Sequence, residues 1–295
     1  MKVRKAELLL VLVTMFWGSS YLFMKMGLNT LGEFNLIALR FGLAFLLAIF
    51  LFHKRLRQVN FRTIKYGVVL GFLLLGVFSC ITFGLKTTTT SNAGFLVALT
   101  VVFVPMFEVL VFKKKVQPQQ IFGSFLAISG IGLLTLTSTL HIQPGDLLCL
   151  LAALFYAVQI MVTGKAVKHC DTLCLGILQL GFVGGYAFIL SVIFESPALP
   201  STIPGWISIL ALGIICSAFG FILQPIAQKY TTPTRTGLIF SLEPVFAAFF
   251  GYWFVGEQLS LQGYAGACLV LLGILASELL GKISPASLLK KRQAH

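Results

Sequence analysis

The chain is a succession of apolar runs of about 20 residues, separated by short polar segments. A helix of this length crosses the roughly 30 Å hydrocarbon core of a bilayer. Strands of a membrane barrel are about half as long and alternate between polar and apolar residues. The runs in this chain are longer and do not alternate. The sequence therefore predicts an all-α integral membrane protein. We expect ten transmembrane helices, at about Leu8–Leu28, Phe34–Phe52, Ile64–Leu85, Ser91–Phe112, Ile121–Ser138, Asp146–Lys165, Thr172–Phe194, Ile203–Pro225, Thr234–Val255 and Leu261–Leu280.

Composition supports this interpretation. Hydrophobic residues make up 58% of the 295 residues and charged residues 11%, against about 25% charged residues in soluble proteins. This excludes a cytosolic enzyme, a nucleic-acid-binding domain and a disordered protein. The net charge of +13 comes from Lys and Arg in the short segments between apolar runs. With both termini in the cytoplasm, 19 of the 22 Lys and Arg residues fall on that side, as the positive-inside rule requires. We expect a multi-pass protein of a bacterial inner membrane.

The two halves of the chain match each other. A shift of 139 places Trp17 on Tyr156 and Arg40 on Gln179, and later a shift of 143 places Lys86 on Lys229. We therefore expect two five-helix repeats, at residues 1–141 and 142–295, the second with a basic cytoplasmic tail. Five is an odd number, so the second repeat must enter the membrane from the opposite side. Such inverted repeats are typical of secondary transporters, whose substrate site lies where the repeats meet.

Three short motifs occur in order along this repeat: Phe16-Trp17-Gly18, Leu39-Arg40-Phe41 and Leu242-Glu243-Pro244-Val245. Over about residues 5–281 the chain resembles the EamA family of the drug/metabolite transporter superfamily. The resemblance implies a ten-helix basket around a central cavity, and export or exchange of small metabolites such as amino acids. Gln179 stands where the first repeat has Arg40, and Thr100 where the second has Glu243, so the repeats are not chemically equivalent.

Two charged residues fall at membrane depth, where a charge is costly unless it is paired or hydrated. Glu243 lies near the middle of its span and precedes Pro244, which frees a backbone carbonyl. Its carboxyl group either faces the cavity and exchanges a proton, or forms a structural hydrogen bond that closes the bundle. Arg40 either binds a substrate carboxylate or extends to the external headgroups.

Helical spacing places Trp17, Ser20 and Tyr21 on one face of the first span, and Tyr156 and Gln159 on the matching face of the sixth. Such faces suit a small amphiphilic solute, or alternatively helix packing through polar side chains.

Segments 86–92 and 229–235 start the fourth and ninth spans, where they either cap the helices or attract anionic groups to the two mouths. The further cavity candidates are Asn92, Thr100, Phe103, Gln179 and Ser241.

Together these features predict a secondary transporter, not driven by ATP, that exports or exchanges a small organic metabolite such as an amino acid by alternating access. Uptake or exchange of a nucleotide-like metabolite such as S-adenosylmethionine is one alternative, and a passive channel is another. The spans contain no histidine and the chain no phosphate-binding glycine loop, so we expect no enzyme, no cofactor and no metal. The expected partners are a small-molecule substrate and membrane lipids. Proton coupling and the choice between monomer and homodimer stay open.

Overall fold

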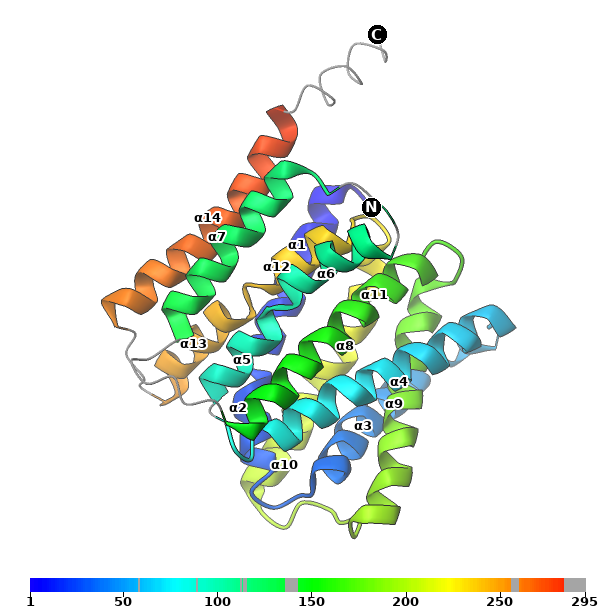
Figure 1. Cartoon of the computed structure of the whole chain (residues 1–295). Helices are drawn as coiled ribbons and strands as arrows, with labels where there is room; N and C mark the ends of the chain where they lie inside the picture. The colour runs from blue at the N-terminus through cyan, green and yellow to red at the C-terminus, as the bar shows by residue number, and fades with distance from the viewer. Residues whose placement is uncertain are drawn as a thin grey trace.

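The computed structural model describes residues 1–57, 59–88, 90–111, 113, 116–135, 143–255 and 260–283. All regular structure in this part of the chain is helical (Figure 1). The elements are α1 (Val3–Gly18), α2 (Ser20–Gly27), α3 (Glu33–Leu56), α4 (Phe61–Gly84), α5 (Thr90–Ala98), α6 (Thr100–Leu110), α7 (Pro118–Thr135), α8 (Pro144–Ala166), α9 (Thr172–Phe194), α10 (Ile203–Leu210), the π-helix η1 (Ala211–Phe219), α11 (Gly220–Gln228), α12 (Pro233–Phe240), α13 (Glu243–Val255) and α14 (Leu261–Ile283).

Seven helical segments of the described chain are long and apolar enough to cross a membrane. They coincide with seven of the ten predicted spans. The other three predicted spans fall on α7, on α12 with α13, and on α14, in which residues 261–276 form a shorter apolar helix. The all-helical class is confirmed. The seven segments are Val3–Gly27, Glu33–Leu56, Phe61–Gly84, Ala93–Leu110, Pro144–Ala166, Thr172–Phe194 and Ile203–Gln228.

Several predicted spans are interrupted helices. One residue, Ser19, separates α1 from α2, and Leu99 separates α5 from α6. Two residues separate α12 from α13, which begins at Glu243 with Pro244 in its first turn. Proline has no backbone N–H to donate and is tolerated there, where no such donor is needed. The Glu-Pro pair thus starts a new helix within the ninth predicted span.

Elements from the two halves pack side by side (Figure 1). Helix α3 lies along α9, α4 lies against α8 and α9, and α7 lies along α14 at one side of the bundle. The last two helices approach each other at glycines: a Cβ atom on Gly130 would lie 2.5 Å from the carbonyl oxygen of Gly266, and one on Gly273 would lie 2.6 Å from that of Gly123. The absence of side chains at these glycines therefore allows α7 and α14 to lie in close contact.

We call the end of the bundle at which α1 begins the N-terminal end, and the opposite one the far end. Polar contacts between distant segments hold the far end together. The Glu195 carboxylate accepts hydrogen bonds from the backbone N–H groups of Phe34 (3.0 Å) and Asn35 (2.8 Å) at the start of α3. Lys86 and Glu33 form an ion pair.

Candidate functional site

Aromatic side chains from both halves meet in the centre of the bundle. The ring centroid of Trp17 on α1 lies 4.7 Å from that of Phe221 on α11 and 4.9 Å from that of Phe240 on α12. Tyr156 on α8 stacks on Phe240 at 5.8 Å. Phe78 on α4 lies 5.8 Å from Phe221. All five side chains are buried. We call Trp17, Phe78, Tyr156, Phe221 and Phe240 the central cluster.

The indole of Trp17 is fixed by a hydrogen bond across the bundle. Its Nε1 donates to the backbone carbonyl of Cys216, at 2.9 Å. Cys216 lies in η1, the π-helical stretch of the eighth predicted span. The first helix and the π-helix, about 200 residues apart, are therefore joined at the wall of the central cluster.

A cavity of about 20 Å³ lies within the central cluster. It can hold roughly one water molecule, so this cavity is too small for a metabolite. The sequence placed Trp17, Ser20, Tyr21 and Tyr156 around a common cavity, and all four line this one. The Tyr156 hydroxyl is buried and has no hydrogen-bond partner among the described residues.

Glu243 also lines the central cavity, and its side chain is hydrogen-bonded to that of Tyr21 on α2. The carboxyl group is buried, with 9% of the residue exposed. The carboxyl group therefore faces the cavity and also forms a hydrogen bond between helices of the two halves. Proton exchange by Glu243 stays a prediction.

Arg40 is completely buried beside the central cluster. Its Nε donates to the Ser217 hydroxyl at 3.0 Å, and its guanidinium lies 4.8 Å from the ring centroid of Phe41 and 4.5 Å from that of Phe78. Its two terminal nitrogens have no hydrogen-bond partner among the described residues. Arg40 does not line the cavity itself, but Phe78, on which it stacks, does.

Four glutamine side chains form a hydrogen-bonded series that we call the glutamine ladder: Gln179, Gln159, Gln224 and Gln228. Gln179 donates to the backbone carbonyl of Phe221 at 2.8 Å, and Gln159 donates to Gln179 at 3.3 Å. Gln224 donates to Gln159 at 3.1 Å and lies 3.5 Å from the Gln228 carbonyl oxygen. All four are 0–1% exposed.

The ladder changes the interpretation of two predicted cavity residues. Gln159 and Gln179 belong to it and do not line the central cavity. The sequence offered no expectation for Gln228. The signal that could have found it is its spacing from Gln224, since residues four apart lie on the same helix face.

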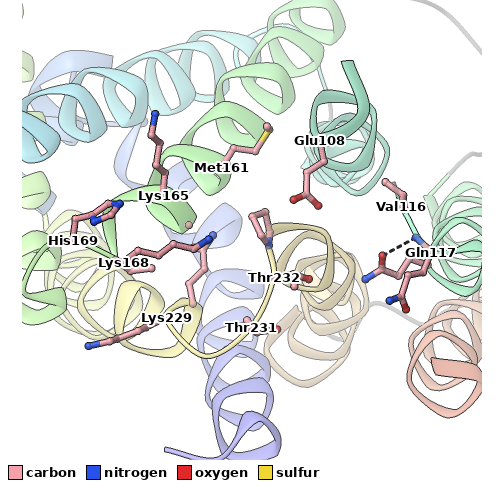
Figure 2. Close-up of a pocket in the computed structure, with 15 residues that line it drawn as sticks. Glu108, Val116, Gln117, Met161, Lys165, Lys168, His169, Lys229, Thr231 and Thr232 are labelled. Carbon is pink, nitrogen blue, oxygen red and sulfur yellow. Dashed lines mark hydrogen bonds between the residues drawn. The ribbon is translucent and has the colours of Figure 1, made fainter. Parts of the chain in front are cut away.

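A larger pocket of about 560 Å³ opens at the N-terminal end (Figure 2). It lies between the ends of α6, α8 and α11 and the starts of α7 and α12. Gln228 belongs to its wall, so the glutamine ladder runs from this pocket to Phe221 in the central cluster. The polar and charged side chains around it include Glu108, Gln117, Lys165, Lys168, His169, Lys229, Thr231 and Thr232.

The remaining candidates lie elsewhere. The hydroxyl of Thr100 donates to the Val97 carbonyl at 2.6 Å, and that of Ser241 to the Leu238 carbonyl at 2.6 Å. Both hydrogen bonds lie at helix interruptions, and neither residue lines the central cavity. Phe103 is half-buried and packs on the hydrophobic core. The side chain of Asn92 lies outside what the structure describes. No group of His, Cys, Asp and Glu in the described residues could hold a metal ion.

The sequence model of the EamA-like transporter family matches residues 4–136 and again residues 143–278. The chain belongs to the EamA-like transporter family. The two matches confirm the resemblance inferred from the sequence, and the seven apolar helices agree with a multi-pass integral membrane protein.

Individual relatives agree with this assignment. An uncharacterized transporter of Archaeoglobus fulgidus is 28% identical to this EamA-like transporter over 92% of the chain and 96% of the relative. A biotin transporter of Salmonella typhimurium is 24% identical over 73% of each chain. A solved crystal structure shares the fold, with a TM-score of 0.79, 17% identity and coverage of 95% of this chain and 98% of the other.

Proposed function

We propose that the protein is a secondary transporter that moves a small carboxylate-bearing metabolite, such as an amino acid, by alternating access. In this proposal ten spans form two inverted repeats of five, and the substrate binds in the central cluster, where the repeats meet. The transport function comes from the family. The spans, the site and the substrate class rest on the following contacts.

The observation that carries the proposal is that equivalent residues of the two repeats touch. Trp17 and Tyr156, which are 139 positions apart, have ring centroids 5.9 Å apart. Phe78 and Phe221, which are 143 positions apart, have centroids 5.8 Å apart. Equivalent residues meet directly only near a twofold axis, as at a symmetric dimer interface. Both pairs lie in the central cluster, so the axis of the inverted repeat would pass through the site.

The polar groups around the cluster favour a solute that carries a carboxylate. The two terminal nitrogens of Arg40 are free to hold a carboxylate in a bidentate pair. Glu243 and the aromatic faces suit an ammonium group, which is attracted to carboxylates and to ring faces. An amino acid carries both groups, and so does S-adenosylmethionine. The substrate named for the Salmonella relative, biotin, also carries a carboxylate.

The closed centre favours alternating access over a passive channel. A channel needs a continuous path, whereas here a cavity of about 20 Å³ lies beyond a pocket of about 560 Å³. A solute bound in the centre would require the helices to rearrange. Opening of one end at a time is the expected behaviour of two repeats that exchange roles.

Counterflow in proteoliposomes tests the proposal. Vesicles preloaded with unlabelled amino acids, biotin or S-adenosylmethionine would be offered the labelled compound, with protein-free vesicles as the blank. We expect saturable exchange for at least one carboxylate and none for its amide. Arg40→Gln should abolish the exchange, and Arg62→Gln, which changes an exposed arginine, should leave it unchanged. Linear flux that never saturates, or single-channel currents, would contradict the proposal.

A further inference from the structure

The pocket at the N-terminal end is strongly basic. Lys165, Lys168 and His169 reach it from the end of α8, and Lys229 from the end of α11 (Figure 2). None of these three lysines forms an ion pair with a carboxylate of the described chain. Among the described residues of its wall, Glu108 is the acidic one, and it accepts a hydrogen bond from the Thr234 hydroxyl.

The positive charge of these lysines is not balanced by ion pairs, so an anion would be attracted to the pocket. Three exposed lysines at the rim of one concavity raise the positive potential there. Thr231 belongs to the wall of this pocket, and its hydroxyl is buried without a hydrogen-bond partner among the described residues. Its volume of about 560 Å³ lies within the range of about 300–1,000 Å³ typical of small-molecule sites.

The pocket is also connected to the centre. Its wall includes Gln228, at one end of the glutamine ladder. At the other end of the ladder, Gln179 donates to the backbone carbonyl of Phe221. The amides carry donors and acceptors but no charge. An anion that leaves the lysines would therefore be held less tightly along the ladder, before it reaches Arg40 beside the central cluster.

We propose that this pocket is a capture site for the oxyanion group, carboxylate or phosphate, of a small metabolite before it reaches the central cluster. This proposal rests on the transport function proposed above, because it assumes that the substrate binds in this pocket first and then moves to the central cluster. The competing explanation is that these lysines only set the orientation of the chain in the membrane. In that case they should act like Lys2, Lys5 and Lys54, which are also exposed but lie outside the pocket.

Binding can be measured without transport. The protein, labelled with ¹³C-histidine, would be placed in phosphatidylcholine nanodiscs, and the His169 signal would be assigned by its loss in His169→Gln. We would titrate succinate, inorganic phosphate and uncharged succinamide, with chloride to match ionic strength. We expect saturable shifts of the His169 signal with succinate or phosphate and none with succinamide. A parallel sample in phosphatidylglycerol nanodiscs tests a lipid headgroup as the source of the anion.

Two triple variants provide the matched comparison. Lys165→Gln with Lys168→Gln and Lys229→Gln should weaken binding by about tenfold or more, whereas Lys2→Gln with Lys5→Gln and Lys54→Gln should change it less than about twofold. The two variants lose the same charge, and thermal unfolding would show that both fold. Equal weakening in both variants, or no saturable shift, would overturn the capture site. If the His169 signal shifts in phosphatidylglycerol nanodiscs but not on addition of succinate or phosphate in phosphatidylcholine nanodiscs, the pocket binds a lipid headgroup and the capture site is overturned.

The two proposals fail separately. A saturable His169 shift without counterflow would leave the anion site in place and refute the transport function proposed for it. Counterflow of a carboxylate without any shift would support transport and refute the capture site alone.

Discussion

Gln159 and Gln224 hold each other through both ends of their amide groups. Gln224 Nε2 donates to Gln159 Oε1 at 3.1 Å, and Gln159 Nε2 lies 3.5 Å from Gln224 Oε1. The pair joins α8 to α11, and neither side chain is exposed. Separating α8 from α11 here would leave both buried amides short of a partner, which costs free energy. The pair therefore stabilises the contact between these two helices.

Replacing one member of this pair should cost more than replacing both. We expect Gln159→Leu or Gln224→Leu alone to lower the free energy of unfolding by about 1–3 kcal/mol, because the buried amide left behind loses one of its partners in the ladder. The double variant should recover part of this loss. A double-mutant cycle in mixed micelles measures the difference, with the exposed Gln262→Leu as control. Strict additivity of the two losses would show that the amides do not interact.

The hydrogen bond between the Trp17 indole and the Cys216 carbonyl should contribute to stability. We expect Trp17→Phe, which keeps a large ring but removes the donor, to cost about 1 kcal/mol, and Trp17→Ala to cost about 3–5 kcal/mol. Unfolding followed by circular dichroism would measure both. Trp206→Phe is the control, since Trp206 is 42% exposed. A loss as large in this control would argue against a specific role of the hydrogen bond.

The contact between α7 and α14 should tolerate no added methyl group. In Gly130→Ala the new Cβ would lie 2.5 Å from the Gly266 carbonyl oxygen, so the helices must separate. We expect a loss of about 1–3 kcal/mol. Gly185→Ala is a matched control, because nothing lies within 4 Å of its added Cβ, and alanine there should stabilise the helix by up to about 1 kcal/mol. Equal melting midpoints for the two variants would contradict the close packing.

Glu243 should be the proton-exchanging group if transport is coupled to pH. Glu243→Gln keeps the shape and an acceptor for the Tyr21 hydroxyl but removes the ionisable proton. We expect counterflow by this variant to be independent of pH, while that of the unmodified protein changes with pH. Glu7→Gln is the control, since Glu7 lies outside the central cavity and pairs with Arg235 at 2.8 Å. An unchanged pH profile in Glu243→Gln would leave Glu243 a purely structural role.

The helical class and the family could be predicted from the sequence, because the length of the apolar runs, their composition and the match between the two halves can all be read along the chain. Trp17 and Tyr156 were placed together for the same reason, since helical spacing and the repeat both pointed to them. The interruptions at Ser19 and Leu99 were not predicted. Gly18 next to Ser19 is a local signal for a break, but no proline or glycine stands beside Leu99, where tertiary packing decides that the helix breaks.

The glutamine ladder and the basic pocket also escaped the sequence analysis. Gln159 and Gln179 were expected at a cavity because polar groups in a membrane helix face inward, but the pattern of one helix does not reveal which partner it meets. Lys165 was assigned to topology, and segment 229–235 either to helix capping or to the attraction of anionic groups at a mouth. The positions of Lys165 and Lys229 in the chain do not show that they share a concavity. Such facts depend on how helices distant in sequence are arranged.

The π-helical stretch η1 has a consequence for motion. A π-turn contains more residues than an α-turn, and such turns are often found at functional sites. If η1 were to rewind into ordinary α-helix, α11 would turn by roughly 100° about its own axis for each surplus residue absorbed. Such a twist would carry Gln224 and Gln228 out of line while α10 stayed in place. The winding of η1 thus sets the rotation of α11 relative to α10, and with it the alignment of the glutamine ladder.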